Sequence, residues 1–166
     1  ATVLVIMLYS VFSRERYDLT VMMISSDAQS DMVYRVKDTE EAFEAFCPDF
    51  DGNGETNVEV RYIDLQQSGD PNFDAASRTK LLAEMTTGTV QLYLLDKATF
   101  DYIEGGEDYS EFFISLSDIA NGSQLEFNNQ AFPIADSEFA SLARWESAGD
   151  NVFISVRNEF DTLMAD

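Results

Sequence analysis

The chain contains no histidine, and it has a single cysteine, Cys47. Without histidine it lacks the commonest general base and the commonest transition-metal ligand, so Ser–His–Asp and Cys–His catalysis are excluded. One cysteine cannot form an internal disulfide or a thiolate metal cluster. Because Cys47 lies between Phe46 and Pro48 at the end of an expected helix, we interpret it as a buried small hydrophobic residue rather than a reactive thiol.

Basic residues are also scarce. There are 10 Lys and Arg against 31 Asp and Glu, which gives a formal net charge of -21. Such a surface repels phosphate backbones and anionic lipid headgroups, so we expect no nucleic-acid partner. Nine acids and no base lie between Lys97 and Arg144, and we interpret this stretch as a solvated acidic face rather than a dedicated cation or partner site.

Long apolar runs are absent except at the N-terminus. Residues 1–12, ATVLVIMLYSVF, are broken only by Thr2 and Ser10 and lead into the charged sequence SRERYD. A spanning helix needs about 20 apolar residues, so this run alone is too short to cross a bilayer. We interpret residues 1–13 as a truncated membrane anchor, with a buried element of the fold or a signal-peptide core as the alternatives. An anchor predicts an extracytoplasmic protein held at a cell membrane.

Residues 14–166 alternate strand and helix patterns, and we expect them to form a single α/β domain. Residues 18–25, DLTVMMIS, form a continuous apolar run, which is typical of a central strand covered on both faces. Residues 57–65, NVEVRYIDL, alternate apolar and polar side chains, which favours a parallel neighbour at or near the sheet edge. Further strands are expected at residues 89–96 and 151–158. The pattern predicts a mainly parallel sheet with helices on both faces.

Helix signals lie between these strands. Asp38 is the expected cap of a helix over residues 39–47, and Asp74 that of the next helix, which Gly88 should end. Another helix is expected over residues 137–145. Its apolar side chains are expected to lie in the core rather than to form a sugar-stacking platform; they are Phe139, Leu142 and Trp145.

The loop PDFDGNGETNVE, residues 48–59, carries the clearest chemical motif. Asp49, Asp51 and Asn53 stand at alternate positions before Gly54, as at the start of an EF-hand calcium loop, and Glu55 could add its backbone carbonyl. The twelfth position is Val60, where such loops have a bidentate Glu. A distant carboxylate could complete a calcium shell, but an Asp-Asn-Gly turn is also favourable without metal. Calcium is therefore the candidate cofactor, and a plain turn is the alternative.

Residues 18–100 resemble the first lobe of the bacterial extracellular solute-binding proteins, the substrate receptors of ABC importers. The likeness rests on the strands at 18–25 and 57–65, the helix at 39–47, and above all RTKLLAEMTTGTVQLYLLD, residues 78–96. In that family an equivalent Lys-Leu-rich helix ends at a Gly and leads into a strand that ends near an Asp, at the edge of the ligand cleft. The family's receptors trap solute between two lobes, and this chain has the length of one.

The resemblance implies a domain that binds a small solute or a partner protein and is not an enzyme. One alternative is an acidic protein-interaction module stabilised by calcium. The other is a hydrolase that uses only Asp and Glu, which the absence of histidine disfavours.

Overall fold

The computed structural model describes residues 17–26, 31–65, 69–104, 112–117, 125–126, 129–145 and 151–158. Its strands are β1 (Leu19–Ser25), β2 (Val58–Asp64), β3 (Leu92–Asp96), β4 (Phe132–Pro133) and β5 (Val152–Val156). Its helices are the 3₁₀ helix η1 (Met32–Arg35), α2 (Val36–Phe46), α3 (Pro71–Thr87), α4 (Lys97–Glu104) and α5 (Glu138–Leu142). The expected anchor at residues 1–13 lies outside the described residues. Within the part of the chain described, no helix has both the length and the apolar character to cross a membrane.

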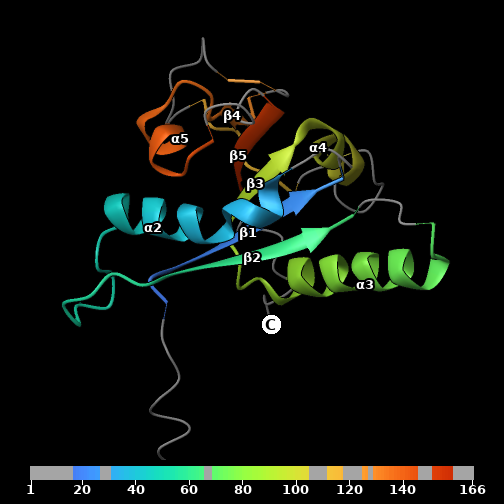
Figure 1. Ribbon diagram of the computed structural model, residues 1–166, viewed down its shortest axis with the longest axis horizontal. Helices are drawn as coiled ribbons and strands as arrows, with labels where there is room; N and C mark the ends of the chain where they lie inside the picture. The colour runs from blue at the N-terminus through green and yellow to red at the C-terminus, as the bar shows by residue number, and fades with distance from the viewer. Residues whose placement is uncertain are drawn as a thin grey trace, which may run out of the picture.

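The strands form one sheet in the order β2-β1-β3-β5-β4 (Figure 1). β1 is central and pairs in parallel with β2, from Leu19 opposite Val58 to Ser25 opposite Asp64. β1 also pairs in parallel with β3 on its other side. The prediction for residues 18–25 and 57–65 is therefore confirmed. It holds because β1 is buried on both faces, whereas β2 alternates at an edge.

The sheet is mixed, because β5 runs antiparallel between β3 and β4. The expected mainly parallel arrangement thus holds for β1, β2 and β3 but not for the last strand in the chain. β4 is a two-residue edge strand, and Pro133 fits there because an edge position does not need every backbone N–H.

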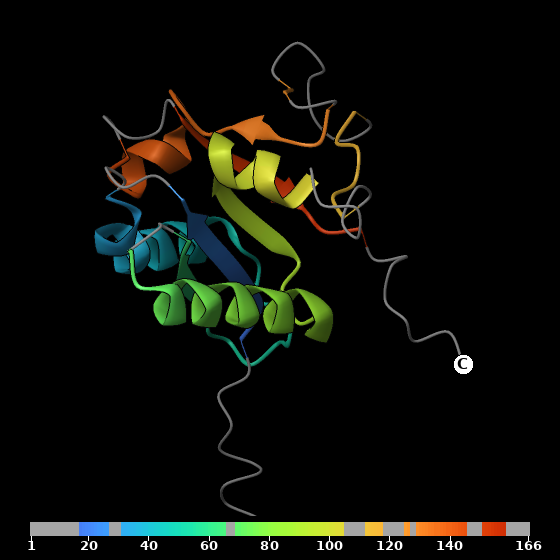
Figure 2. The ribbon, with the colours of Figure 1, turned by 90° about the vertical axis from the view of Figure 1, so that its right-hand side faces the viewer.

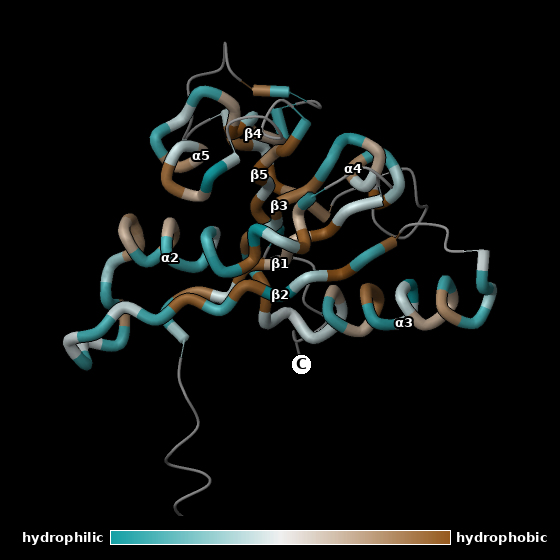
Figure 3. Tube along the Cα trace, in the orientation of Figure 1, coloured by the Kyte–Doolittle hydropathy of each residue, from teal (hydrophilic) through white to brown (hydrophobic). Residues whose placement is uncertain are grey.

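Helices cover both faces of the sheet, as expected. α3 and α4 lie in front of the sheet in Figure 2 and α2 lies behind it, so each face has its own core. Figure 3 shows strongly hydrophobic colour along the central strands. The front core is built around Met22, Ile24, Leu81, Met85, Tyr93, Leu95, Phe100, Ile103, Phe112, Phe113 and Phe153. The rear core is built around Val21, Met23, Met32, Ala42, Phe43, Val58, Val60, Leu94, Ala140 and Trp145.

Both expected N-terminal caps are wrong. α2 follows directly on η1 and begins at Val36, so Asp38 lies inside its first turn. α3 begins at Pro71, whose fixed φ suits the first helical position, and Asp70 caps it by accepting a hydrogen bond from the Asn72 amide at 2.9 Å. The expected end of this helix is confirmed, because Gly88 takes a left-handed φ of 71°.

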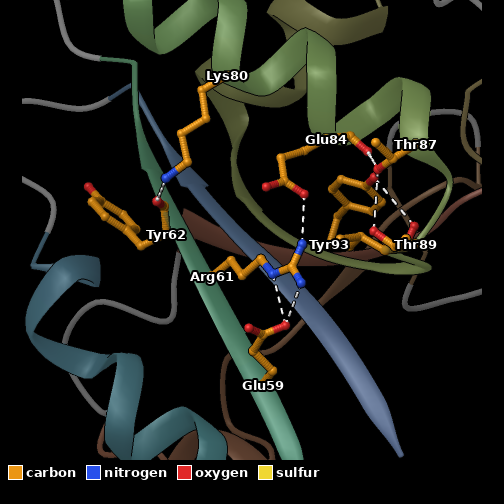
Figure 4. A network of polar contacts seen from close by, with 9 residues as sticks. Glu59, Arg61, Tyr62, Lys80, Glu84, Thr87, Thr89 and Tyr93 are labelled. Carbon is orange, nitrogen blue, oxygen red and sulfur yellow. Dashed lines mark hydrogen bonds and ion pairs between the residues drawn. The ribbon is translucent and has the colours of Figure 1, made fainter. Parts of the chain in front are cut away.

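Ionic contacts attach α3 to the edge strand β2 (Figure 4). The Arg61 guanidinium lies 2.7 Å from Glu59 and 2.8 Å from Glu84 of α3. Hydrogen bonding to Glu59, assisted by Glu84, raises the pKa of Arg61 despite partial burial. On the outer edge of β2, the Lys80 ammonium donates to the Tyr62 carbonyl and the Glu40 carboxylate accepts from the Val60 amide. These side chains occupy backbone groups that would otherwise be open to another strand.

Trp145 joins α5 and its following turn to α2. It is 1% exposed, and its indole N–H donates to the Thr39 hydroxyl at 3.1 Å, so the expected core position is confirmed. The expectation for Leu142 is wrong, because that side chain is 49% exposed. The helix ends at Leu142 and Arg144 takes a positive φ of 58°, so helical spacing does not continue to Trp145.

We expect Trp145→Phe to lower the free energy of unfolding by about 1–3 kcal/mol, since it removes buried volume and leaves the Thr39 hydroxyl without its donor. Leu142→Ala, on the same segment but exposed, should change it by less than about 0.5 kcal/mol. Urea unfolding followed by circular dichroism measures both variants. Tryptophan fluorescence does not serve here, because Trp145 is the only tryptophan and Trp145→Phe removes it. Equal losses in the two variants would contradict this role of Trp145.

Candidate functional site

The loop between α2 and β2 folds around the Asp49 carboxylate. One of its oxygens accepts from the Gly52 amide at 2.6 Å and the other from the Gly54 amide at 2.8 Å. Asp51 accepts from the Asn53 amide at 3.0 Å, and the Asn53 side-chain oxygen accepts from the Glu55 amide at 2.8 Å. Gly52 and Gly54 have φ of 72° and 91°, a conformation that side chains disfavour, so both glycines are required by the turn.

Asp18, just before β1, contributes a third carboxylate to this loop. It accepts hydrogen bonds from the amides of Phe50 at 2.7 Å and Asn57 at 2.9 Å. Asp18, Asp49 and Asp51 each place a carboxylate oxygen within 4.8 Å of the others. The hydrogen bond from Asn57 lowers the pKa of Asp18, and those from Asp51 and Phe50 add to it against the effect of desolvation.

Asp18 was not among the predicted calcium ligands. A signal for it was present, because Asp18 and Asn57 each precede one of two strands expected to be parallel neighbours. Because parallel neighbours start at the same end of the sheet, the residues just before them lie close together. The Asp18 amide indeed donates to the Asn57 carbonyl at 2.8 Å.

The structure thus brings two of the four predicted calcium residues, Asp49 and Asp51, together with Asp18. The Asn53 side-chain oxygen accepts from the Glu55 amide. Glu55 was predicted to contribute its backbone carbonyl, which the grouping of carboxylates does not test, so its role stays a prediction. Three clustered carboxylates attract a hard cation. Each of the three also accepts backbone N–H groups, so the loop is held together without one. Both interpretations, calcium site and plain turn, agree with this geometry.

A second polar cluster lies at the carboxyl ends of β1 and β3. Asp96, the last residue of β3, is 6% exposed. It accepts from the Ser25 hydroxyl at 2.8 Å, from the Ser26 amide at 2.9 Å and from the Thr99 amide at 2.7 Å. The Thr99 hydroxyl donates in turn to Ser26. This carboxylate therefore ties the two strands together and caps the first turn of α4.

Burial acts to raise the pKa of Asp96, but the hydrogen bonds from Thr99, Ser25 and Ser26 outweigh it, and the pKa lies below its ordinary value. The carboxylate is thus ionised at neutral pH. β2 follows β1 in the chain and pairs on one side of it, whereas the next strand, β3, pairs on the other side. The strand order therefore reverses at β1. Ligands of open α/β sheets bind outside the strand ends at such a reversal.

Asp101 and Cys47 have ordinary roles. Asp101 pairs with Lys97 at 2.7 Å. Cys47 is half-buried rather than buried, and desolvation, followed by the nearby Asp18 charge, raises the pKa of its thiol. A raised pKa lowers the fraction of thiolate, the nucleophilic form, at neutral pH.

Comparison with known proteins gave no match to any family model, to any curated protein or to any solved structure.

If the loop binds calcium, millimolar Ca²⁺ should raise the melting temperature, because a ligand that binds only the native state stabilises it by RT ln(1 + [L]/Kd), about 1.4 kcal/mol at a tenfold excess over Kd. An incomplete loop predicts a Kd of about 10⁻⁴ to 10⁻³ M, and Mg²⁺ should have a smaller effect. Asp51→Asn keeps an oxygen for the turn but removes the charge, and should abolish the shift. Glu55→Gln should retain it. An unchanged melting curve, or a shift that persists in Asp51→Asn, would leave a plain turn.

Proposed function

We propose that this protein is a non-catalytic binding domain, similar to one lobe of a solute-binding protein, that holds a small solute at the carboxyl ends of β1 and β3. We further propose that residues 1–13 hold it on the outer side of a bacterial membrane, a placement that rests on the apolar run in the sequence. The observation that carries the binding site is the reversal of strand order between β1 and β3, with hydroxyl and carboxylate groups at that point.

The chemistry of this cluster favours binding over catalysis. A general acid or base must exchange a proton near the working pH. Asp96 is instead held ionised by its donors and is almost fully buried. Ser26 is the member best placed to meet a solute, because it is half-buried whereas Ser25, Asp96 and Thr99 are buried. Its hydroxyl both donates to Asp96 and accepts from Thr99.

A second candidate function is an acidic protein-interaction module stabilised by calcium. The group of Asp18, Asp49 and Asp51 favours it, because this group lies at the amino end of β1, away from the proposed solute site. A hydrolase based on Asp and Glu is the least supported function, since the clustered carboxylates at both ends of β1 are occupied by N–H and O–H donors.

A thermal-shift screen of amino acids, sugars and short peptides against the full chain tests the proposal. We expect at least one solute to raise the melting temperature, to be recovered unchanged, and to shift the amide resonances of Ser26 and Thr99. Ser26→Ala should weaken its binding about three- to tenfold, the worth of one hydrogen bond. Ser141→Ala, an exposed serine on α5, should not. A solute that is chemically converted, or that shifts only resonances distant from Ser26, would contradict the proposal.

A further inference from the structure

An aromatic groove lies on the rear of the domain, between α2, α5 and the last two strands. Its volume is about 260 Å³. The helices α2 and α5 that flank it are labelled in Figure 1. Its lining consists of Phe43, Phe46, Phe132, Ile134, Ser137, Glu138, Phe139 and Ile154. Six of these eight side chains are apolar, so water inside the groove finds few hydrogen-bond partners.

Aromatic rings make up much of the groove lining. The rings of Phe43 and Phe139 lie 4.5 Å apart and pack against each other. Phe46 stands at the C-terminal end of α2, with its ring 6.5 Å from that of Phe139, and is 52% exposed. Contact with another chain would bury the Phe46 ring, and exposed aromatic side chains of this kind often anchor protein interfaces.

A second hollow of about 350 Å³ adjoins the aromatic groove, and the two share Phe132 and Ser137. The exposed acids Glu126 and Asp136 line this hollow, and Glu138 lines the groove itself. Among the residues that the structure describes, no Lys or Arg lines either hollow. None of the three carboxylates forms an ion pair with a described residue, in contrast to Asp31, Glu59 and Asp101 elsewhere.

We propose that this surface binds a segment of a partner protein that carries a bulky apolar side chain next to Lys or Arg. The apolar side chain occupies the aromatic groove, and the cation faces Glu126, Asp136 and Glu138. The adjoining acids repel anionic lipids and fatty acids, which would otherwise suit an apolar groove. This interaction surface is separate from the proposed solute site and does not depend on it.

The probe is a peptide with the sequence Gly-Phe-Lys-Phe-Lys-Gly, acetylated and amidated, titrated into the ¹⁵N-labelled full chain. We expect saturable shifts of the amide resonances of Phe46, Ser137 and Phe139. Binding should weaken as NaCl rises from about 0.05 to 0.5 M, because the exposed carboxylates are screened. Peptides with Glu in place of Lys, or with Ala in place of Phe, should bind at least tenfold more weakly.

Matched variants separate the groove from the rest of the surface. Phe46→Ala and Glu138→Gln should each weaken binding of the Phe-Lys peptide, the former about tenfold or more. Phe73→Ala removes a similarly exposed ring on α3, 49% against 52%, and Glu55→Gln removes one exposed charge in the α2–β2 loop. Both control variants should bind like the wild type, and all four should keep the wild-type melting temperature within a few degrees.

Three results would overturn the proposal. One is the absence of any saturable shift with the Phe-Lys peptide. Another is equal binding of the Glu-containing peptide, which would remove the role of the acids. The last is a self-associated protein that becomes monomeric in Phe46→Ala and binds no peptide, because the groove would then belong to a second copy of this chain.

Discussion

The centre of the fold depends on the hydrogen bonds that the Asp96 carboxylate accepts. Asp96 is the last residue of β3, and its hydrogen bonds hold both the end of the neighbouring β1 and the first turn of α4. Because the group is 6% exposed, these bonds lie in a medium of low dielectric, where they are strong when made and costly when left unmade. Without them, two parallel strands and a helix would end side by side with buried donors and no acceptor.

A related arrangement holds the other end of β1. There Asp18 accepts hydrogen bonds from the amides of Phe50 and Asn57, and so fixes the α2–β2 loop to the start of the central strand. The protein therefore uses one aspartate at each end of β1 to stabilise the backbone around it. The two candidate sites, the solute site and the acidic loop, are built on these same anchors, and the aromatic groove lies apart from both.

The sequence was sufficient where burial or a single residue determines the local structure. The continuous apolar run at residues 18–25 predicts a central strand, and Gly88 predicts the end of α3, because each pattern has one favourable solution. The direction of β5 was not predictable, since an antiparallel strand and a parallel one have the same local pattern. The cap at Asp70 was missed because Asp74, four residues later, satisfies the same rule.

The sites were less accessible from the sequence than the fold. Asp18 and Asp96 accept hydrogen bonds from the backbone of Asn57 and Ser26, which lie 39 and 70 residues away. The expected pairing of β1 and β2 was the only signal for Asp18, and no local spacing rule joins Asp96 to Ser26. Phe46 lies at the C-terminal end of α2, and its exposure depends on where α5 packs against that helix. Such facts follow from the arrangement of elements, which local patterns do not determine.

The most direct test of the role of Asp96 is the pH dependence of unfolding in Asp96→Asn, compared with the wild type by urea titration. The folded-state pKa of Asp96 is below its ordinary value of 3.8, so its ionised form stabilises the fold; this contribution is complete above about pH 4 and is lost as pH falls through the lowered pKa. At pH 7 the variant should therefore be less stable by about 1.5–3 kcal/mol, the worth of hydrogen bonds to a charged group. The difference should shrink as pH falls below 4, whereas Asp101→Asn on the exposed face of α4 should differ little from the wild type. A difference that is absent at pH 7, or that stays constant into acid, would contradict the central role of this carboxylate.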